Sequence, residues 1–236
     1  MGLFLKEGTD IFGEILCDYR DGRDVFEIIE RSDGFVAFNS IDRYFACYDD
    51  WPKIEKRAME YVEGRVLDLG CGAGRHSIFL QSEGFDLLAI DISPTAIRVC
   101  EERGVERTKV MDFREVGELN EEFGTVLLLG NNFGFLGKKV TSRKVLNDLY
   151  EITSENGKIL AESKKPSKLN GFSSARKRNK DIMTYEVRVK YREKSTDWFK
   201  FLSVSEEGMK EILEGTGWRI DSVLKSEDLN VFVVKK

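Results

Sequence analysis

The chain has 236 residues, of which 41% are hydrophobic and 11% aromatic, and its 42 acidic residues outnumber its 37 Lys and Arg, giving a formal net charge of −5. This length and composition predict one decorated domain or two small ones with a full hydrophobic core, and they exclude a disordered chain. A net acidic chain is a poor candidate for nonspecific nucleic-acid binding. The sequence has no apolar run of about 18 residues, which excludes a membrane-spanning helix.

The four cysteines and the single histidine form no metal-site pattern. Cys17, Cys47, Cys71 and Cys100 never approach C-x-x-C spacing, and no cluster of histidines accompanies them, since His76 is alone. Structural zinc, iron–sulfur and disulfide-framework sites are therefore not predicted, and we expect no metal. The N-terminal segment carries acids within its apolar stretch and lacks a small-residue cleavage site. We therefore expect no signal peptide and a reducing, cytoplasmic location.

The first region, residues 1–63, is predicted to be an extension with short strands and a helix. The stretch VFEIIERSDGFVAFN indicates two strands around a Ser-Asp-Gly turn. Pro52 suits the first position of a helix, and an apolar stripe follows it until Gly64.

The middle of the chain alternates helical segments with strand-length apolar segments. Helices are predicted over 76–83, 94–104 and 141–155, each followed or ended by a glycine signal, and Ser93-Pro94 is predicted to cap the second. The strand-length segments are Val66–Leu69, Leu87–Ile90, Thr108–Met111, Val126–Leu129 and Lys158–Ala161. Strands alternating with helices predict a parallel sheet with right-handed crossovers, and hence a doubly wound α/β fold.

The remaining segment is predicted to add a loop, four strands and one helix. Residues 164–180 contain seven basic residues and no acids, which is typical of a loop. Further along, strands are predicted over 183–191 and 198–204, a helix after Ser205, and a terminal strand pair over 218–224 and 230–234.

The most informative motif is the glycine loop of VLDLGCGAGRH, where a buried strand carrying Asp68 runs into Gly70, Gly72 and Gly74 before a helix. Glycines in such a loop allow a sharp turn and a close approach of a ligand to the backbone. The third glycine of a dinucleotide fingerprint would fall at position 75, which is Arg75, so a nicotinamide dinucleotide is disfavoured. A loop that serves only as a tight turn remains the alternative.

Two acids follow the glycine loop at regular intervals. Asp91 ends the next strand, where a carboxylate can accept hydrogen bonds from both hydroxyls of a ribose. Asp112 ends the strand after that, where its carboxylate could accept a hydrogen bond from an exocyclic amine. Phe113 or Ile92 could pack on a purine ring. In a doubly wound sheet these strand ends meet at one crevice. Alternatively, Asp91 is an ordinary acid at a helix start, and Asp112 is likewise not a ligand-binding residue.

The chain resembles the class I S-adenosylmethionine-dependent methyltransferases over roughly residues 60–165. The motifs that carry the resemblance are VLDLGCGAG, LLAIDIS, VMDF, the glycine that closes VLLLG, and GKILAES. The resemblance implies a Rossmann-like methyltransferase fold, which is a mostly parallel seven-stranded sheet with its last strand antiparallel. Residues 64–236 would then form the methyltransferase domain, with a substrate-side insertion at about 166–204.

The resemblance also implies S-adenosylmethionine as the cofactor. The glycine loop would contact its methionine and ribose portions, Asp91 the ribose, Asp112 with Phe113 the adenine, and Gly130 the methionine part. The predicted cofactor-binding residues are Asp68, Gly70, Cys71, Gly72, Arg75, Asp91, Ile92, Asp112, Phe113 and Gly130. One departure is Gly124, because the family often has an acid before the fourth strand; the cofactor assignment does not depend on it.

The absence of four motifs narrows the class of molecule that could accept the methyl group. The chain has no Pro-Cys dipeptide, no Asn-Pro-Pro-Tyr, no Asp-Asn dipeptide and no C-x-x-x-C-x-x-C. It therefore does not resemble base C5-methylating, base amino-methylating, catechol-type or radical enzymes. A metal-free transferase that acts on a small molecule is the remaining expectation.

The candidate catalytic residues are His76, Asn131 and Tyr44. His76 could act as a general base, or it could simply hydrogen-bond at the helix start. Asn131 could orient an acceptor, or it could serve the turn before Gly134. Tyr44 belongs to an aromatic cluster (Tyr44, Phe45, Tyr48 and Trp51) that could close over the cofactor as a lid, with ordinary helix packing as the alternative.

We expect a cytoplasmic S-adenosylmethionine-dependent methyltransferase with a small-molecule acceptor. An RNA or protein methyltransferase that docks through the basic loop 164–180 is the alternative, although the loop's single aromatic residue offers little base stacking. A binding protein that has lost catalysis is a further alternative. The acceptor's identity and the oligomeric state are not predicted.

Overall fold

A computed structural model describes residues 10–172 and 181–236 of the chain. The chain divides into two compact units. The first comprises Met1–Trp51, Leu67–Phe113 and Glu186–Phe199, and the second comprises Pro52–Val66, Arg114–Tyr185 and Lys200–Lys236. The end of the predicted basic loop, residues 173–180, lies outside the described residues. Among the described helices, none is long and apolar enough to cross a lipid bilayer.

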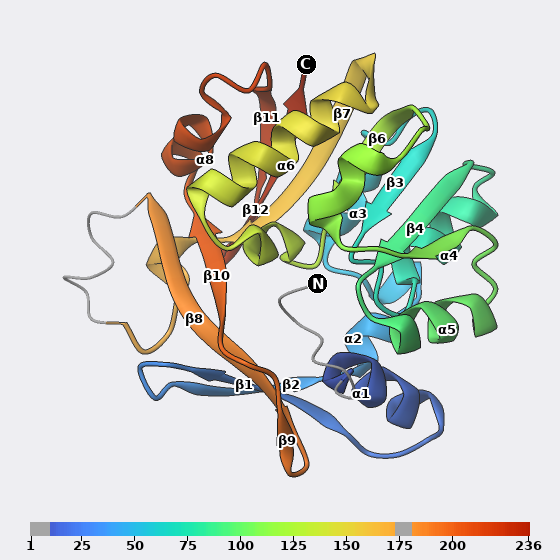
Figure 1. Cartoon of the computed structure of the whole chain (residues 1–236), viewed down its shortest axis with the longest axis vertical. Helices are drawn as coiled ribbons and strands as arrows, with labels where there is room; N and C mark the ends of the chain where they lie inside the picture. The colour runs from blue at the N-terminus through green and yellow to red at the C-terminus, as the bar shows by residue number, and fades with distance from the viewer. Residues whose placement is uncertain (1–9, 173–180) are drawn as a thin grey trace. The chain divides into compact units, whose positions relative to one another are not determined.

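The predicted α/β fold is confirmed by a seven-stranded sheet with the order β11-β12-β7-β6-β3-β4-β5 (Figure 1). Its strands are β3 (Val66–Leu69), β4 (Leu87–Asp91), β5 (Thr108–Val110), β6 (Phe123–Leu128), β7 (Thr153–Lys164), β11 (Arg219–Lys225) and β12 (Leu229–Lys235). The pairs β4–β5 and β6–β7 are parallel, and β12 runs antiparallel to both of its neighbours. The buried strands β3 and β4 are apolar almost throughout, as strands covered on both faces should be.

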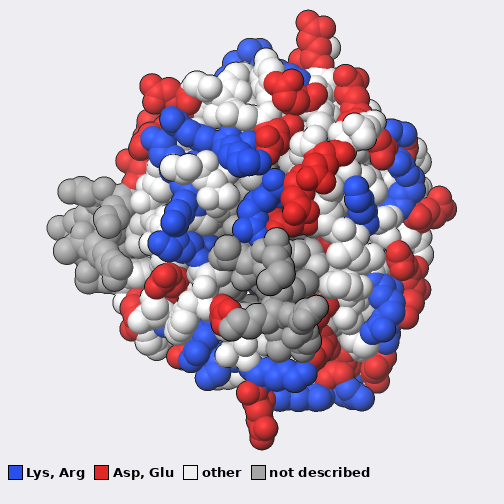
Figure 2. Space-filling model, in the orientation of Figure 1, with Lys and Arg blue, Asp and Glu red and all other residues white. Residues whose placement is uncertain are grey.

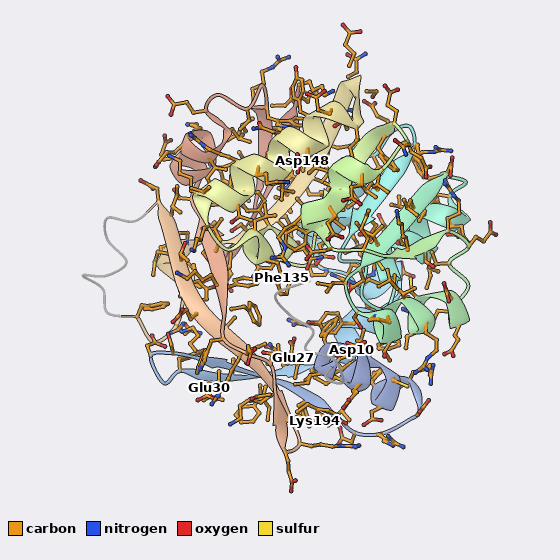
Figure 3. The ribbon with its side chains drawn as sticks, in the orientation of Figure 1. Asp10, Glu27, Glu30, Phe135, Asp148 and Lys194 are labelled. Atoms are coloured by element: carbon orange, nitrogen blue, oxygen red, sulfur yellow. The ribbon has the colours of Figure 1, made fainter. Side chains whose placement is uncertain are left out.

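In the first unit, helices α4 (Arg75–Ser82) and α5 (Pro94–Glu102) follow β3 and β4, and α1 (Ile11–Arg20) packs on α5 (Figure 1). Ser93 caps α5 as predicted, because its hydroxyl accepts from the Ala96 amide at 2.9 Å. Asp10, labelled in Figure 3, caps α1 by accepting from the Gly13 amide at 3.0 Å. The same carboxylate also accepts from the Ser93 hydroxyl at 2.7 Å and the Thr95 amide at 2.9 Å, so it joins the starts of α1 and α5.

In the second unit, α6 (Lys139–Glu151) lies along the sheet next to α8 (Glu206–Leu213), and α3 (Lys53–Met59) contacts β11 and β12 (Figure 1). Two predicted helix ends were wrong. The helix predicted to reach residue 155 stops at Glu151, because Thr153 already pairs with Phe123 in the sheet. The helix predicted to reach Gly64 stops at Met59 and continues only as turns.

A second sheet has the order β10-β8-β1-β2, with the two-residue strand β9 beside β8. Its strands are β1 (Phe26–Arg31), β2 (Val36–Ser40), β8 (Ile182–Tyr191), β9 (Lys194–Ser195) and β10 (Phe199–Val204). The predicted hairpin around Ser-Asp-Gly is therefore confirmed, with Glu27 opposite Asn39 and Ile28 opposite Phe38. The side chains of Glu27 and Arg31 are buried on one face, whereas Phe26 and Phe38 are exposed on the other.

Candidate cofactor site

The glycine loop after β3 has a backbone that only glycine adopts comfortably. Gly72 has φ +56°, and Gly74, at the start of α4, has φ +78°. A Cβ atom on Gly74 would lie 2.5 Å from the Cys100 sulfur on α5, so this glycine is required for α5 to pack against the loop. Gly72 is buried, and the nearest neighbours of a Cβ on it would be the rings of Phe12 and Tyr44, at 3.8 Å.

Asp91, at the end of β4, has the geometry expected of a ribose-binding carboxylate. It is 7% exposed, and its two oxygens accept one amide hydrogen each, from Gly72 at 3.0 Å and from Ser93 at 2.9 Å. Each oxygen retains a further lone pair, which fits a pair of hydroxyl donors. Burial raises the pKa of Asp91 to about 6 against the lowering effect of the two amides, and the nearby acids Asp10 and Asp68 raise it further.

Asp112 and its neighbours follow β5 at the same end of the sheet. Val110 of β5 pairs with Asp91, and the Met111 amide donates to the Asp91 carbonyl at 2.9 Å. Asp112 is buried, and Phe113 and Ile92 are half-buried. The amides of Gly70 and Cys71 in turn donate to the carbonyl of Ile90 at 2.8 and 3.0 Å. The structure therefore brings the glycine loop and the two predicted acids together in the first unit.

Asp68 lies on β3 beneath the loop. It is buried and accepts from the Ser77 hydroxyl of α4 at 2.6 Å. Burial raises the pKa of Asp68, while His76 and Ser77 lower it. This contact fixes α4 against the strand; a direct contact of Asp68 with the cofactor stays a prediction.

His76 and Arg75 both pack against Trp51. The imidazole of His76 lies edge-on to the indole, with ring centroids 4.7 Å apart, and the Arg75 guanidinium lies 5.6 Å from the indole centroid. His76 is buried and Arg75 is half-buried. The structure thus shows a packing role for both residues, and the predicted roles toward acceptor and cofactor remain untested.

Tyr44 lies beside the glycine loop, on the short helix α2 (Asp42–Phe45). Arg103, just after α5, donates to the carbonyls of Ala73, Tyr44 and Phe45, which ties α2 to the loop. The Tyr44 ring packs edge-on against Phe12 of α1, with centroids 5.2 Å apart. The sequence interpretation missed Phe12 because it predicted no helix there, although Asp10 followed by Ile11, Ile15 and Leu16 is a capped amphipathic pattern.

Gly130 and Asn131 belong to the second unit. The Gly130 amide donates to the buried carboxylate of Glu162 at 3.3 Å, and the side-chain oxygen of Asn131 accepts from the Lys164 amide at 2.8 Å. Asn131 adopts a left-handed conformation with φ +66°. These contacts give Asn131 the turn role that the sequence left open, and its acceptor role and the cofactor contact of Gly130 stay predictions.

Comparison with known proteins identifies the segment that carries this site. Residues 66–157 match a family model described as a methyltransferase domain. A glycine/sarcosine N-methyltransferase from Parasynechococcus marenigrum is 35% identical over 127 residues, which cover 51% of this chain and 45% of the relative. One from Aphanothece halophytica is 30% identical over 115 residues, 46% of this chain and 43% of the relative. The chain thus matches less than half the length of these two relatives.

Solved structures resemble a larger part of the chain. A SAM-dependent methyltransferase from Bacteroides fragilis, in complex with S-adenosyl-L-homocysteine, has a TM-score of 0.85 at 20% identity, covering 99% of this chain and 97% of that one. An S-adenosylmethionine-dependent methyltransferase from Clostridium acetobutylicum has a TM-score of 0.63 at 16% identity, covering 83% and 94%. At these identities the similarity establishes the fold.

Proposed function

We propose that this chain, whose residues 66–157 match a methyltransferase domain, belongs to the class I methyltransferase family and transfers a methyl group from S-adenosylmethionine to a small-molecule acceptor. The observation that carries the proposal is the Asp91 carboxylate, buried at the end of β4 with one amide hydrogen on each oxygen and no other hydrogen bond from the described residues. Such a carboxylate fits the two ribose hydroxyls of the cofactor. The glycine loop beside it would contact the methionine part.

The chemistry places few demands on the protein. A sulfonium donor is already activated, so the protein has to align the nucleophile, the methyl carbon and the sulfur, and to exclude water. Alignment of this kind can supply on the order of 7–11 kcal/mol. In the first unit, Gly72, Asp91 and Asp112 would hold the cofactor, and Phe113 and Ile92 would pack on its adenine.

A small acceptor is supported by the two relatives named as glycine/sarcosine N-methyltransferases. On the face drawn in Figure 2, Lys and Arg side chains are interspersed with Asp and Glu side chains, which is not the pattern that phosphate binding favours. The N-terminal extension 1–63 and the insertion at about 166–204 would shape the acceptor side. The protein would act in the cytoplasm, without a membrane or nucleic-acid partner.

Calorimetry with S-adenosylhomocysteine and with NAD tests the cofactor assignment. We expect S-adenosylhomocysteine to bind and NAD not to bind; binding of NAD alone would overturn the proposal. Asp91→Ala should weaken S-adenosylhomocysteine binding by about 1–3 kcal/mol, because a buried charged acceptor is lost. Asp86→Ala is the matched control, since Asp86 is an exposed carboxylate at the other end of β4, 2.8 Å from Arg107. Transfer of labelled methyl into fractionated metabolites would then identify the acceptor.

A further inference from the structure

Glu27 is a buried carboxylate in the first unit that the cofactor site does not use. Glu27, labelled in Figure 3, lies on β1 with 5% of its surface exposed, opposite Asn39 of β2. Its Oε2 atom accepts from the Asn39 amide at 3.0 Å and from the Arg43 guanidinium at 2.9 Å. A carboxylate buried to this degree is retained only where donors or a cation compensate for its lost hydration.

The second carboxylate oxygen of Glu27, Oε1, receives only a weak hydrogen bond. From the residues that the structure describes, Oε1 receives only the Tyr44 hydroxyl, at 3.3 Å, and Oε2 lies at the same distance from that hydroxyl. Charge-assisted hydrogen bonds are normally about 2.7–2.9 Å long. Oε1 therefore has capacity for a further, stronger donor.

Arg43 pairs with Glu27 from the solvent side. Its side chain is 51% exposed, while that of Glu27 is 6% exposed. Because the guanidinium lies half in solvent, a competing cation that reaches Glu27 can replace it and still leave the buried carboxylate paired. The Arg43 guanidinium also lies 4.8 Å from the centre of the Tyr44 ring, which shows that this cluster accepts a cation against an aromatic face.

Tyr44 connects this carboxylate to the cofactor loop. One edge of its ring lies 3.8 Å from the position of a Cβ on Gly72, and its hydroxyl lies at Glu27. Burial and the Glu27 charge raise the pKa of Tyr44, so its hydroxyl stays protonated and acts as a hydrogen-bond donor. Phe12 supplies a second ring at the same glycine. Glu27 is thus one side chain away from the backbone that would hold the methyl donor.

We propose that Glu27 and Tyr44 form the subsite for the acceptor's amino group, so that the acceptors are small primary or secondary alkylamines. The inference rests on the proposed methyltransferase function and specifies its substrate class. The amine arrives as an ammonium ion against Glu27 and releases one proton to water. Its nitrogen then forms a bond to the methyl carbon while the carbon–sulfur bond breaks, and that bond's electron pair stays on sulfur. The positive charge moves from sulfur to the methylated nitrogen, where the Glu27 carboxylate stabilises it.

Binding without turnover tests this subsite. Calorimetry with the protein saturated in S-adenosylhomocysteine would use propylamine and sarcosine as probes, with 1-propanol and methoxyacetate as isosteres that have oxygen in place of the amine. We expect the amines to bind and the isosteres not to bind. Glu27→Gln should weaken amine binding at least ten-fold and leave the S-adenosylhomocysteine dissociation constant unchanged. Glu30→Gln is the matched control, because Glu30 lies on the opposite face of β1, where it pairs with Arg188.

Arg43→Gln provides a second variant that does not depend on the folding of Glu27→Gln. Removal of the competing guanidinium should tighten amine binding at least three-fold, whereas a purely structural Glu27–Arg43 pair gives no change or a loss. Equal binding of amines and isosteres, or amine binding that neither variant alters, would overturn the inference. Failure of the wild-type protein to bind S-adenosylhomocysteine would instead overturn the proposed function. Binding of S-adenosylhomocysteine with no amine binding would overturn this inference alone.

Discussion

Cofactor binding should weaken in acid because of Asp91. Its pKa in the ligand-free protein is about 6, raised mainly by burial. In the proposed site the ribose hydroxyls would need the ionised carboxylate as their acceptor, so protonation would compete with binding. At pH 5.0 about one carboxyl in eleven is ionised, against nearly all at pH 7.5, which raises the dissociation constant about ten-fold, or about 1.4 kcal/mol.

The assay is calorimetric titration of S-adenosylhomocysteine at several values between pH 5.0 and 7.5. Asp91→Asn should bind more weakly and show no such slope, and it also reports any pH dependence that comes from the ligand itself. His76→Gln should retain the wild-type slope, which separates the carboxyl from the imidazole near the loop. A flat wild-type profile, or an equal slope in Asp91→Asn, would refute the reasoning.

Acid should have the opposite effect on the stability of the ligand-free protein, because protonation of Asp91 should stabilise the fold. Because the folded-state pKa lies above the ordinary value of 3.8, the bound proton stabilises the fold. This group therefore removes on the order of 3 kcal/mol of folding free energy as the pH rises from about 4 to about 6. The same carboxylate thus lowers stability at neutral pH, where the proposed function would require it for binding.

Two further substitutions test the packing around the site. Gly74→Ala should lower the melting temperature more than Gly84→Ala does, since both glycines have positive φ but only the Cβ at Gly74 would meet the Cys100 sulfur, at 2.5 Å; equal losses would contradict the close packing of α5. Asp10→Ala should destabilise the protein by about 1–3 kcal/mol in denaturant titrations, because one carboxylate caps α1 and accepts from the Ser93 hydroxyl. A loss within 0.5 kcal/mol, the range typical of surface changes, would count against the double role of Asp10.

The features that the sequence predicted correctly are those whose cause is local. The glycine loop, the acid at the end of β4 and the Ser93 cap each depend on residues within a few positions of one another. The end of α6 was mispredicted because Thr153 pairs with Phe123 in the sheet, and this pairing joins segments that are distant in the sequence. The local sequence pattern of a helix does not reveal a pairing with a distant strand.

The Glu27 cluster was missed for the same reason. It requires the β1–β2 register that sets Glu27 opposite Asn39 and the fold of α2 that brings Arg43 and Tyr44 to the same carboxylate. In the sequence, Glu27 is one acid among 42. Its burial and its contacts distinguish it from most of these acids, and both are properties of the folded chain.

Because Asp10 accepts from Ser93, two residues beyond Asp91, detachment of α1 and release of the cofactor are thermodynamically linked. A ligand that binds only when the Asp91 segment is ordered raises the free energy of opening that segment by RT ln(1 + [L]/Kd), about 2.7 kcal/mol at a hundred times the dissociation constant. Part of that protection extends to α1 through the shared carboxylate. Amide hydrogen exchange in α1 would then slow as the protein is saturated with the cofactor, even without a direct contact between the cofactor and this helix.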